Sequence, residues 1–288
     1  MSVQAAIEEG RFVVTSEVGP PKGTDVSEML VTAEMLRDRV DALNVTDNQA
    51  AVMRLCTLGA CTHLKQHGFD PVLQVTCRDR NRLAVQSDLL GAASLGITEV
   101  LALTGDHVVV GDHPGARAVF DLESVQLLNI VGTLNAGTDL AGNELAGVPD
   151  FFVGAVVTPD ANPIRPQMAK FEKKIRAGAK FFQTQAVYDV ESFRRFMGYA
   201  REFDVKVFAG IVVLRSAGMA RFMNKNIPGI SVPANIIEEL DAASDPVETG
   251  IQVAARFIRE VHDDCDGVHI MAIGAEQLVP RVLDAAEL

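Results

Sequence analysis

Eight short apolar runs, each followed by polar residues and then by a helical pattern, constrain the fold of this chain more than any other feature. These runs cover residues 12–18, 41–47, 71–77, 98–105, 151–157, 179–185, 205–213 and 267–273. They are continuous rather than alternating, which is typical of parallel strands covered on both faces. Eight strand–helix units close naturally into a barrel. The sequence therefore predicts a single (β/α)8 TIM barrel over residues 1–288, with an open doubly wound sheet as the alternative.

The composition supports one large soluble domain. Of the 288 residues, 48% are hydrophobic and 22% are charged, which provides enough apolar material for a sizeable core. The chain has 26 Lys and Arg against 38 Asp and Glu, so its net charge of −12 repels nucleic acids and acidic membranes. No segment approaches the roughly 20 apolar residues of a membrane span, and the N-terminus lacks a signal-peptide pattern. We therefore expect a cytoplasmic protein that binds neither nucleic acid nor membrane.

The cysteines predict neither a disulfide framework nor a metal site. Cys56, Cys61, Cys77 and Cys265 include no CxxC pair, and Cys56 and Cys61 lie five residues apart in a segment with a helical pattern. Zinc would need further ligands that the sequence does not place beside them. We expect core or free thiols and no bound metal.

The barrel fold indicates where functional side chains should lie, because the active sites of such barrels form at the C-terminal ends of the strands. A long irregular loop, residues 104–119, is predicted on the same rim. The polar residues at these strand ends, which we expect to converge on one mouth, are Glu17, Asp47, Asn48, Gln74, Thr76, Thr104, Asp106 and Gln185.

Glu17 is the strongest single candidate, because the first strand carries no other charge. Burying an ionisable group without a partner is unfavourable. One interpretation is a general acid whose protonated form is favoured by partial burial. The alternative is an ion pair with Lys or Arg on a neighbouring strand. Asp106 is a weaker candidate. It follows Gly105, which would let the backbone approach a ligand, but Gly-Asp is also an ordinary turn pair.

Basic and imidazole side chains near the rim have more ambiguous patterns. Lys173 and Lys174 could hold a phosphate together with a helix N-terminus, or they could form a solvated basic helix face. His107 and His113 lie in the rim loop, where a histidine could bind a cofactor but is more often exposed. His269, in the middle of the eighth strand, is expected in the barrel interior.

Five segments together resemble the methylenetetrahydrofolate reductase family. They are FVVTSEVGPPKG, VTCRDRN, LGITEVLALTGD, GAKFFQTQAVYDVESF and GVHIMAIG, in this order and each on a different predicted strand. The combination of Glu-x-x-Pro-Pro after the first strand, Gly-Asp after the fourth and Thr-Gln after the sixth is specific. The resemblance spans nearly the whole chain. It implies a (β/α)8 barrel that reduces 5,10-methylenetetrahydrofolate to 5-methyltetrahydrofolate with a flavin held non-covalently at the mouth.

The resemblance also implies roles for individual residues. Glu17 would be the general acid that opens the methylene bridge to an iminium, Asp106 would stabilise this cation beside the flavin, and Gln185 would hydrogen-bond the folate. An acid and a nearby carboxylate suit hydride transfer to such a cation. The cofactor-binding positions implied by the family pattern are Thr76, Thr104, Gly105, Asp106, Thr158, Asn162, Lys170, Lys173 and Lys174.

Several positions depart from the family pattern. Thr104, Thr158 and Asn162 stand where better-known bacterial members have Arg, Tyr and His, and Val213 and Ala217 replace a Pro and an aromatic residue. The ending MAIGAEQL lacks an Arg that meets the folate tail and resembles small reductase subunits of the acetyl-CoA pathway. The family implies FAD, with FMN as the alternative, NADH or NADPH as electron donor, and a homo-oligomer. The departures suggest a second subunit that supplies electrons.

Two other functions are alternatives to this one. A Schiff-base lyase on the same fold would need a Lys near the mouth, whereas Lys180 and Lys206 lie at strand starts, which face the opposite rim. A non-catalytic or partner-dependent barrel subunit of a folate complex is favoured by the substituted cofactor positions. The presence of Glu17, Asp106 and Gln185 argues against it.

Overall fold

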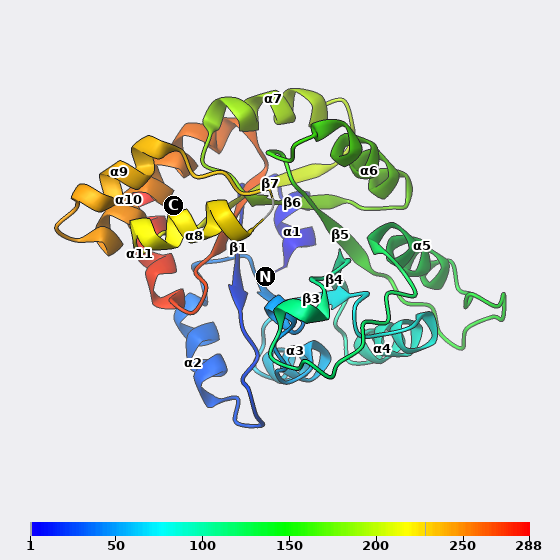
Figure 1. The fold of residues 1–288 in the computed structure, drawn as a ribbon. Helices are drawn as coiled ribbons and strands as arrows, with labels where there is room; N and C mark the ends of the chain where they lie inside the picture. Colours follow the sequence, from blue (N-terminus) through cyan, green and yellow to red (C-terminus); the bar gives the residue numbers. More distant parts are fainter. Residues whose placement is uncertain (1, 228) are drawn as a thin grey trace.

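The computed structural model describes residues 2–227 and 229–288, which form a closed barrel of eight parallel strands (Figure 1). Each strand pairs with its neighbours in chain order, and β8 closes the ring on β1. The strands are β1 (Val13–Val18), β2 (Ala42–Val45), β3 (Pro71–Thr76), β4 (Glu99–Leu103), β5 (Phe152–Val157), β6 (Phe181–Ala186), β7 (Lys206–Val212) and β8 (Gly267–Met271). The predicted (β/α)8 barrel is confirmed, and the doubly wound alternative is wrong.

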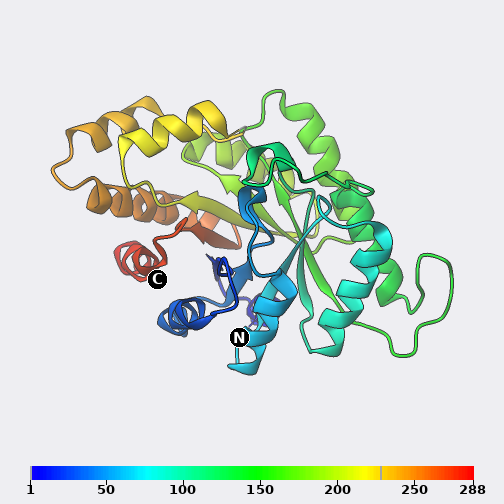
Figure 2. The same cartoon turned by 60° about the horizontal axis from the view of Figure 1, so that its bottom comes forward.

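Helices surround the strands, as a second view shows (Figure 2). They are α2 (Ser27–Leu36), α3 (Thr57–Gln66), α4 (Arg82–Ser94), α5 (Ser124–Asn135), α6 (Ile164–Arg176), α7 (Val190–Ala200), α8 (Ala217–Asn226), α9 (Ala234–Ala242), α10 (Pro246–Val261) and α11 (Val279–Ala286). Short 3-10 turns are η1 (Gln49–Ala51), η2 (Val108–Val110), η3 (His262–Asp264) and η4 (Glu276–Leu278). The segment 104–119 is otherwise irregular, as expected for a long rim loop.

The connection between β7 and β8 is more elaborate than the sequence pattern suggested. Its described residues form α8, α9 and α10 in succession, where one helical pattern was expected. The loop between α8 and α9 returns to the rim beside β5. There Gly229 packs so closely on Thr158 that a Cβ at position 229 would lie 2.2 Å from the Thr158 methyl carbon.

A short helix, α1 (Val3–Glu8), closes the N-terminal end of the barrel and lies at the centre of the ring in Figure 1. Val3 and Ala6 are fully buried in one cluster with inward-facing strand residues such as Leu101. Glu99, at the start of β4, accepts hydrogen bonds from the backbone N–H groups of Val3 at 3.1 Å and Gln4 at 2.7 Å. Burial raises the pKa of Glu99 to about 7. Because this end is plugged, the opposite end is the one that can admit a ligand.

Aromatic rings fill the part of the barrel interior nearer the N-terminal ends of the strands. Phe181 stacks on Phe152 at 5.6 Å and on Phe208 at 5.5 Å between ring centroids. The Phe181 ring also fills the space beside Gly154, where a Cβ would lie 2.3 Å from it.

The four cysteines are free thiols, as expected. Cys61 and Cys77 are buried, Cys265 is half-buried and Cys56 is exposed at the start of α3. Burial raises the pKa of Cys77 to about 12, so this thiol is unreactive at neutral pH. Among the described residues, no helix is both long enough and apolar enough to cross a membrane.

Candidate active site

A cavity of about 400 Å³ opens at the C-terminal end of the strands, and we call it the inner cavity. Its volume lies in the range of small-molecule sites, roughly 300–1,000 Å³. Apolar walls come from β4, β5 and β8. The polar lining includes every residue expected to converge on the mouth, namely Glu17, Asp47, Asn48, Gln74, Thr76, Thr104, Asp106 and Gln185.

Glu17 is held at the end of β1 by side-chain amides. Its side chain is 13% exposed, and its carboxylate accepts hydrogen bonds from the amides of Gln74 at 3.4 Å and Gln49 at 3.3 Å. The Nε2 atom of His269 lies 3.8 Å from its Oε1 atom. Within the described ranges no Lys or Arg pairs with Glu17, so the alternative of a structural ion pair is wrong.

A layer of buried polar side chains lies next to Glu17, on the side toward the N-terminal end of the barrel. His269 Nδ1 is 2.9 Å from the hydroxyl of Thr15, which also accepts from the Gln183 amide at 3.2 Å. Gln183 in turn accepts from the amide of Asn44 at 2.8 Å. His269 is in the barrel interior, as expected, but its approach to Glu17 was missed. The sequence could have predicted this approach, because strand residues alternate faces and Thr15 and Glu17 therefore both face the barrel interior.

Two arginines that follow β3 were missed by the sequence analysis, although the segment VTCRDRN was noticed. Arg80 binds both carboxylate oxygens of Asp47, at 2.7 and 3.2 Å, and Asp47 also accepts from the backbone and hydroxyl of Thr76. Arg78 is 2% exposed and donates to the backbone oxygens of Asp47 at 3.3 Å and Asp106 at 3.5 Å. Asp47 therefore anchors neighbouring strand ends and is not free to act on a substrate.

The loop after β4 approaches β3 closely at Gly105. This residue has φ +87°, and a Cβ would lie 2.9 Å from the Cβ atom of Thr76, so the position requires glycine. Asp106 follows on the exposed side of the loop and lines the inner cavity. The rim-loop histidines His107 and His113 are exposed and do not belong to its lining.

The expected cationic residues on α6 divide into two groups. Lys170 and Lys174 line the inner cavity, whereas Lys173 is exposed on another face of the helix. Asn162 is also exposed, just before α6, and lies outside this lining. The lysines occupy the last turns of α6, so they do not lie at the N-terminus of their own helix. Lys173 and Asn162 are therefore poorly placed to bind a ligand in this cavity.

Lys174 is the most perturbed base of the inner cavity. It is buried, its ammonium donates to the Val156 carbonyl at 2.7 Å, and burial together with the charge of Lys170 lowers its pKa to about 8. Lys170 pairs with Glu123 at 2.8 Å. The α6 side of the cavity is thus positively charged, and this positive charge is only partly neutralised by Glu123.

Gln185 lies on an irregular stretch at the end of β6, where the pairing with β7 shifts register between Gln183 and Ala186. Its amide oxygen accepts from the backbone of Ala186 at 3.2 Å, and its side chain lines the inner cavity. The two lysines that a Schiff-base lyase would need near the mouth lie on the opposite rim, with Lys180 just before β6 and Lys206 at the start of β7. In the described part of the chain no group of three His, Cys, Asp or Glu side chains could hold a metal ion.

The chain has relatives among proteins of known sequence. Residues 2–287 match the family model described as Methylenetetrahydrofolate reductase. The chain is 28% identical over 262 residues to 5,10-methylenetetrahydrofolate reductase of Pectobacterium carotovorum, covering 88% of this chain and 81% of that protein. It is 25% identical over 296 residues to Methylenetetrahydrofolate reductase 2 of Schizosaccharomyces pombe. That match covers 96% of this chain but 46% of the yeast protein.

A solved structure with the same fold is an uncharacterized protein from Clostridium thermocellum that binds two copies of 5-methyl-5,6,7,8-tetrahydrofolic acid. The two folds superpose with a TM-score of 0.67 at 15% sequence identity, covering 100% of this chain and 98% of that one. At this identity the likeness shows the shared barrel.

Proposed function

The chain belongs to the methylenetetrahydrofolate reductase family, and we propose that it reduces 5,10-methylenetetrahydrofolate to 5-methyltetrahydrofolate in the inner cavity. The observation that carries this proposal is the setting of Glu17. Its carboxyl group is nearly buried at the cavity wall, accepts hydrogen bonds from two amides, and has no Lys or Arg partner among the described residues. Such a group can exchange a proton with a substrate, because no ion pair must first be broken.

The residues around the inner cavity fit a flavin. Gly105 leaves no side chain between the rim loop and β3, and Leu103, Val157 and Met271 provide apolar surface for a flat ring. Lys170 and Lys174 supply positive charge on one side, which suits a phosphate. When bound, the reduced flavin supplies the hydride.

The hydroxyl and amide groups of the lining would hold the uncharged parts of the cofactor. Thr76, Thr104 and Thr158 all line the inner cavity and offer hydroxyls to a ribityl chain. We take these three, together with Gly105, Asp106, Lys170 and Lys174, as the cofactor-binding residues. Asn162 and Lys173 are left out because they lie outside the lining.

In the proposed reaction three side chains act on the folate. Glu17 donates its proton to the nitrogen that leaves the one-carbon bridge, and the electron pair of the broken C–N bond stays on that nitrogen. The remaining nitrogen forms an iminium with the one-carbon group, and the carboxylate of Asp106 offsets its positive charge. The amide of Gln185 hydrogen-bonds the folate ring and orients it. A folate ligand is in keeping with the Clostridium thermocellum barrel, which binds a methylated folate.

We propose FAD as the cofactor, with FMN as the alternative, and NADH or NADPH as the electron donor. The first experiment is the visible absorption spectrum of the gently purified protein, repeated anaerobically with each nucleotide. Flavin bands near ~450 nm that one nucleotide bleaches and methylenetetrahydrofolate restores would support the full proposal. Bands that neither nucleotide bleaches would indicate a second subunit as electron source. A protein that takes up neither flavin would contradict the flavin-dependent function.

The role of Glu17 is tested separately with Glu17→Gln. This variant should keep its flavin bands and their bleaching by the donor, because Gln preserves the shape of the residue. Folate turnover should fall by roughly 10²–10⁴-fold, the usual contribution of a general acid. Glu202→Gln, at an exposed position beyond α7, is the matched control and should leave turnover unchanged. Normal turnover of Glu17→Gln would remove Glu17 from the mechanism.

A further inference from the structure

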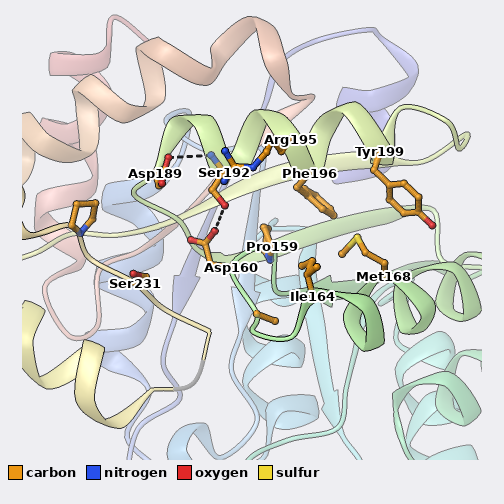
Figure 3. A pocket seen from close by; sticks show the side chains of 12 residues that line it. Pro159, Asp160, Ile164, Met168, Asp189, Ser192, Arg195, Phe196, Tyr199 and Ser231 are labelled. Carbon is orange, nitrogen blue, oxygen red and sulfur yellow. Dashed lines mark hydrogen bonds between the residues drawn. The ribbon is translucent and has the colours of Figure 1, made fainter.

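A second cavity lies on the same rim as the inner cavity but outside the ring of strands, and we call it the outer cavity. Its volume is about 760 Å³, within the range of small-molecule sites. It is open to solvent and bounded by the start of α6, the facing side of α7 and the connection between α8 and α9 (Figure 3). Thr158 lines the inner cavity, whereas the next residues, Pro159 and Asp160, line the outer one. The two cavities are therefore neighbours with separate linings.

Asp160 gives the outer cavity an acceptor that lacks a hydrogen bond. Its Oδ1 atom accepts from the Ser192 hydroxyl at 2.5 Å, but its buried Oδ2 atom has no partner among the described residues. Ser192 is itself fixed at the start of α7, where its backbone N–H donates to Asp189 at 3.0 Å (Figure 3). Burial raises the pKa of Asp160, and the nearby charge of Asp189 adds to this effect. A buried acceptor in this position favours a ligand that brings a donor.

The remaining walls suit a flat ring. Phe196 on α7 lies opposite Ile164 on α6, and Met168 and Tyr199 extend this apolar surface along the two helices (Figure 3). The Tyr199 hydroxyl donates to Glu172 at 2.7 Å, which holds its ring in place. Aromatic and thioether side chains of this kind stack on heteroaromatic rings.

Arg195 supplies an available positive charge at the edge of the outer cavity. It is exposed, it lines the cavity, and its charge acts on Asp160. The preceding residue, Arg194, is held by Asp264 at 2.7 Å and Glu191 at 3.4 Å. Within the described residues no ion pair of this kind holds Arg195, so its guanidinium can bind an anionic group.

We propose that the outer cavity binds a small molecule with an amino-substituted heteroaromatic ring and an anionic tail. The ring stacks between the apolar sides of α6 and α7, its exocyclic amine donates to Asp160, and the tail pairs with Arg195. Pterin and adenine compounds share this chemistry and are the two sources to distinguish. This site is independent of the proposed reductase activity, because none of its residues lines the inner cavity.

The test is calorimetric titration of the purified full chain with 5′-AMP and, separately, with folic acid. We expect one of the two to bind the outer cavity. Binding should weaken by about tenfold or more in both Asp160→Asn and Arg195→Gln, since each removes a charge-assisted hydrogen bond. The matched controls are Asp150→Asn and Arg165→Gln, which change exposed residues outside both linings and should leave the affinity unchanged.

The two ligands give different signatures. AMP should bind once in the wild type, and its affinity should be at least about tenfold weaker in Asp160→Asn. Folic acid can also enter the inner cavity, so for a pterin site the wild type should bind two molecules, and only the binding to the outer cavity should weaken in Asp160→Asn. Thermal unfolding midpoints of all variants confirm that they are folded. Failure of both ligands to bind at millimolar concentration, or binding that neither variant weakens, would overturn the proposal.

Discussion

Glu99 makes the stability of the barrel depend on pH through the helix that plugs its N-terminal end. Its carboxyl group is 3% exposed and accepts from two backbone N–H groups of α1, yet burial raises its pKa from 4.5 to about 7. Because the folded pKa is higher than the unfolded one, the contribution of this group is fully present below pH 4.5 and is lost as the pH rises through 7. The difference corresponds to about 3 kcal/mol of unfolding free energy. Asp70, whose charge also raises this pKa, belongs to the same end of the barrel.

The substitution Glu99→Gln removes this titration. Its amide group donates where the carboxylate accepted, so the variant carries a constant penalty at every pH. Apart from that constant penalty, the variant should gain about 2.5 kcal/mol of unfolding free energy relative to the wild type between pH 5 and pH 8. Urea unfolding of both proteins at one-unit pH steps measures the difference, in which all other titrating groups cancel. The exposed Glu8→Gln in the same helix is the control. A difference that stays constant within about 0.5 kcal/mol across this range would refute the reasoning.

Two further substitutions test the inner cavity. Gly105→Ala should lower the unfolding free energy by about 2 kcal/mol or more, since the new side chain would combine positive φ with a Cβ 2.9 Å from Thr76. Gly115→Ala in the same loop is the control, because a Cβ there meets nothing within 4 Å. It should change the unfolding free energy by under about 0.5 kcal/mol in the same urea assay. Lys174→Met should raise the unfolding free energy at pH 7 by about 1–3 kcal/mol, because a folded pKa of about 8 means that the fold disfavours the charged lysine. This gain should shrink as the pH rises toward 10.5, the ordinary pKa of lysine. The same variant should bind flavin more weakly in a titration, and unchanged flavin affinity would exclude Lys174 from the cofactor site.

The positions of the strands and of the polar residues at their C-terminal ends could be predicted from sequence because both depend on local patterns. A parallel strand covered by helices needs a continuous apolar run, and a polar residue at the C-terminal end of that run must lie at the rim. Glu17, Asp106 and Gln185 satisfy this rule and line one cavity. Lys173 and Asn162 were placed in the cofactor site by the family resemblance, which does not say which way a side chain faces, and neither lines the inner cavity.

The sequence by itself determined the number of strands, the closed barrel and the rim on which a site could form, because these follow from hydrophobic periodicity along the chain. Tertiary structure decided which polar groups meet. Thr15 and His269 pair across β1 and β8 although 254 positions separate them, and this places an imidazole beside Glu17. Arg80 reaches Asp47 only because β2 and β3 are neighbours in the closed ring. The outer cavity likewise requires three distant segments to come together, and such contacts depend on register and packing that no local pattern encodes.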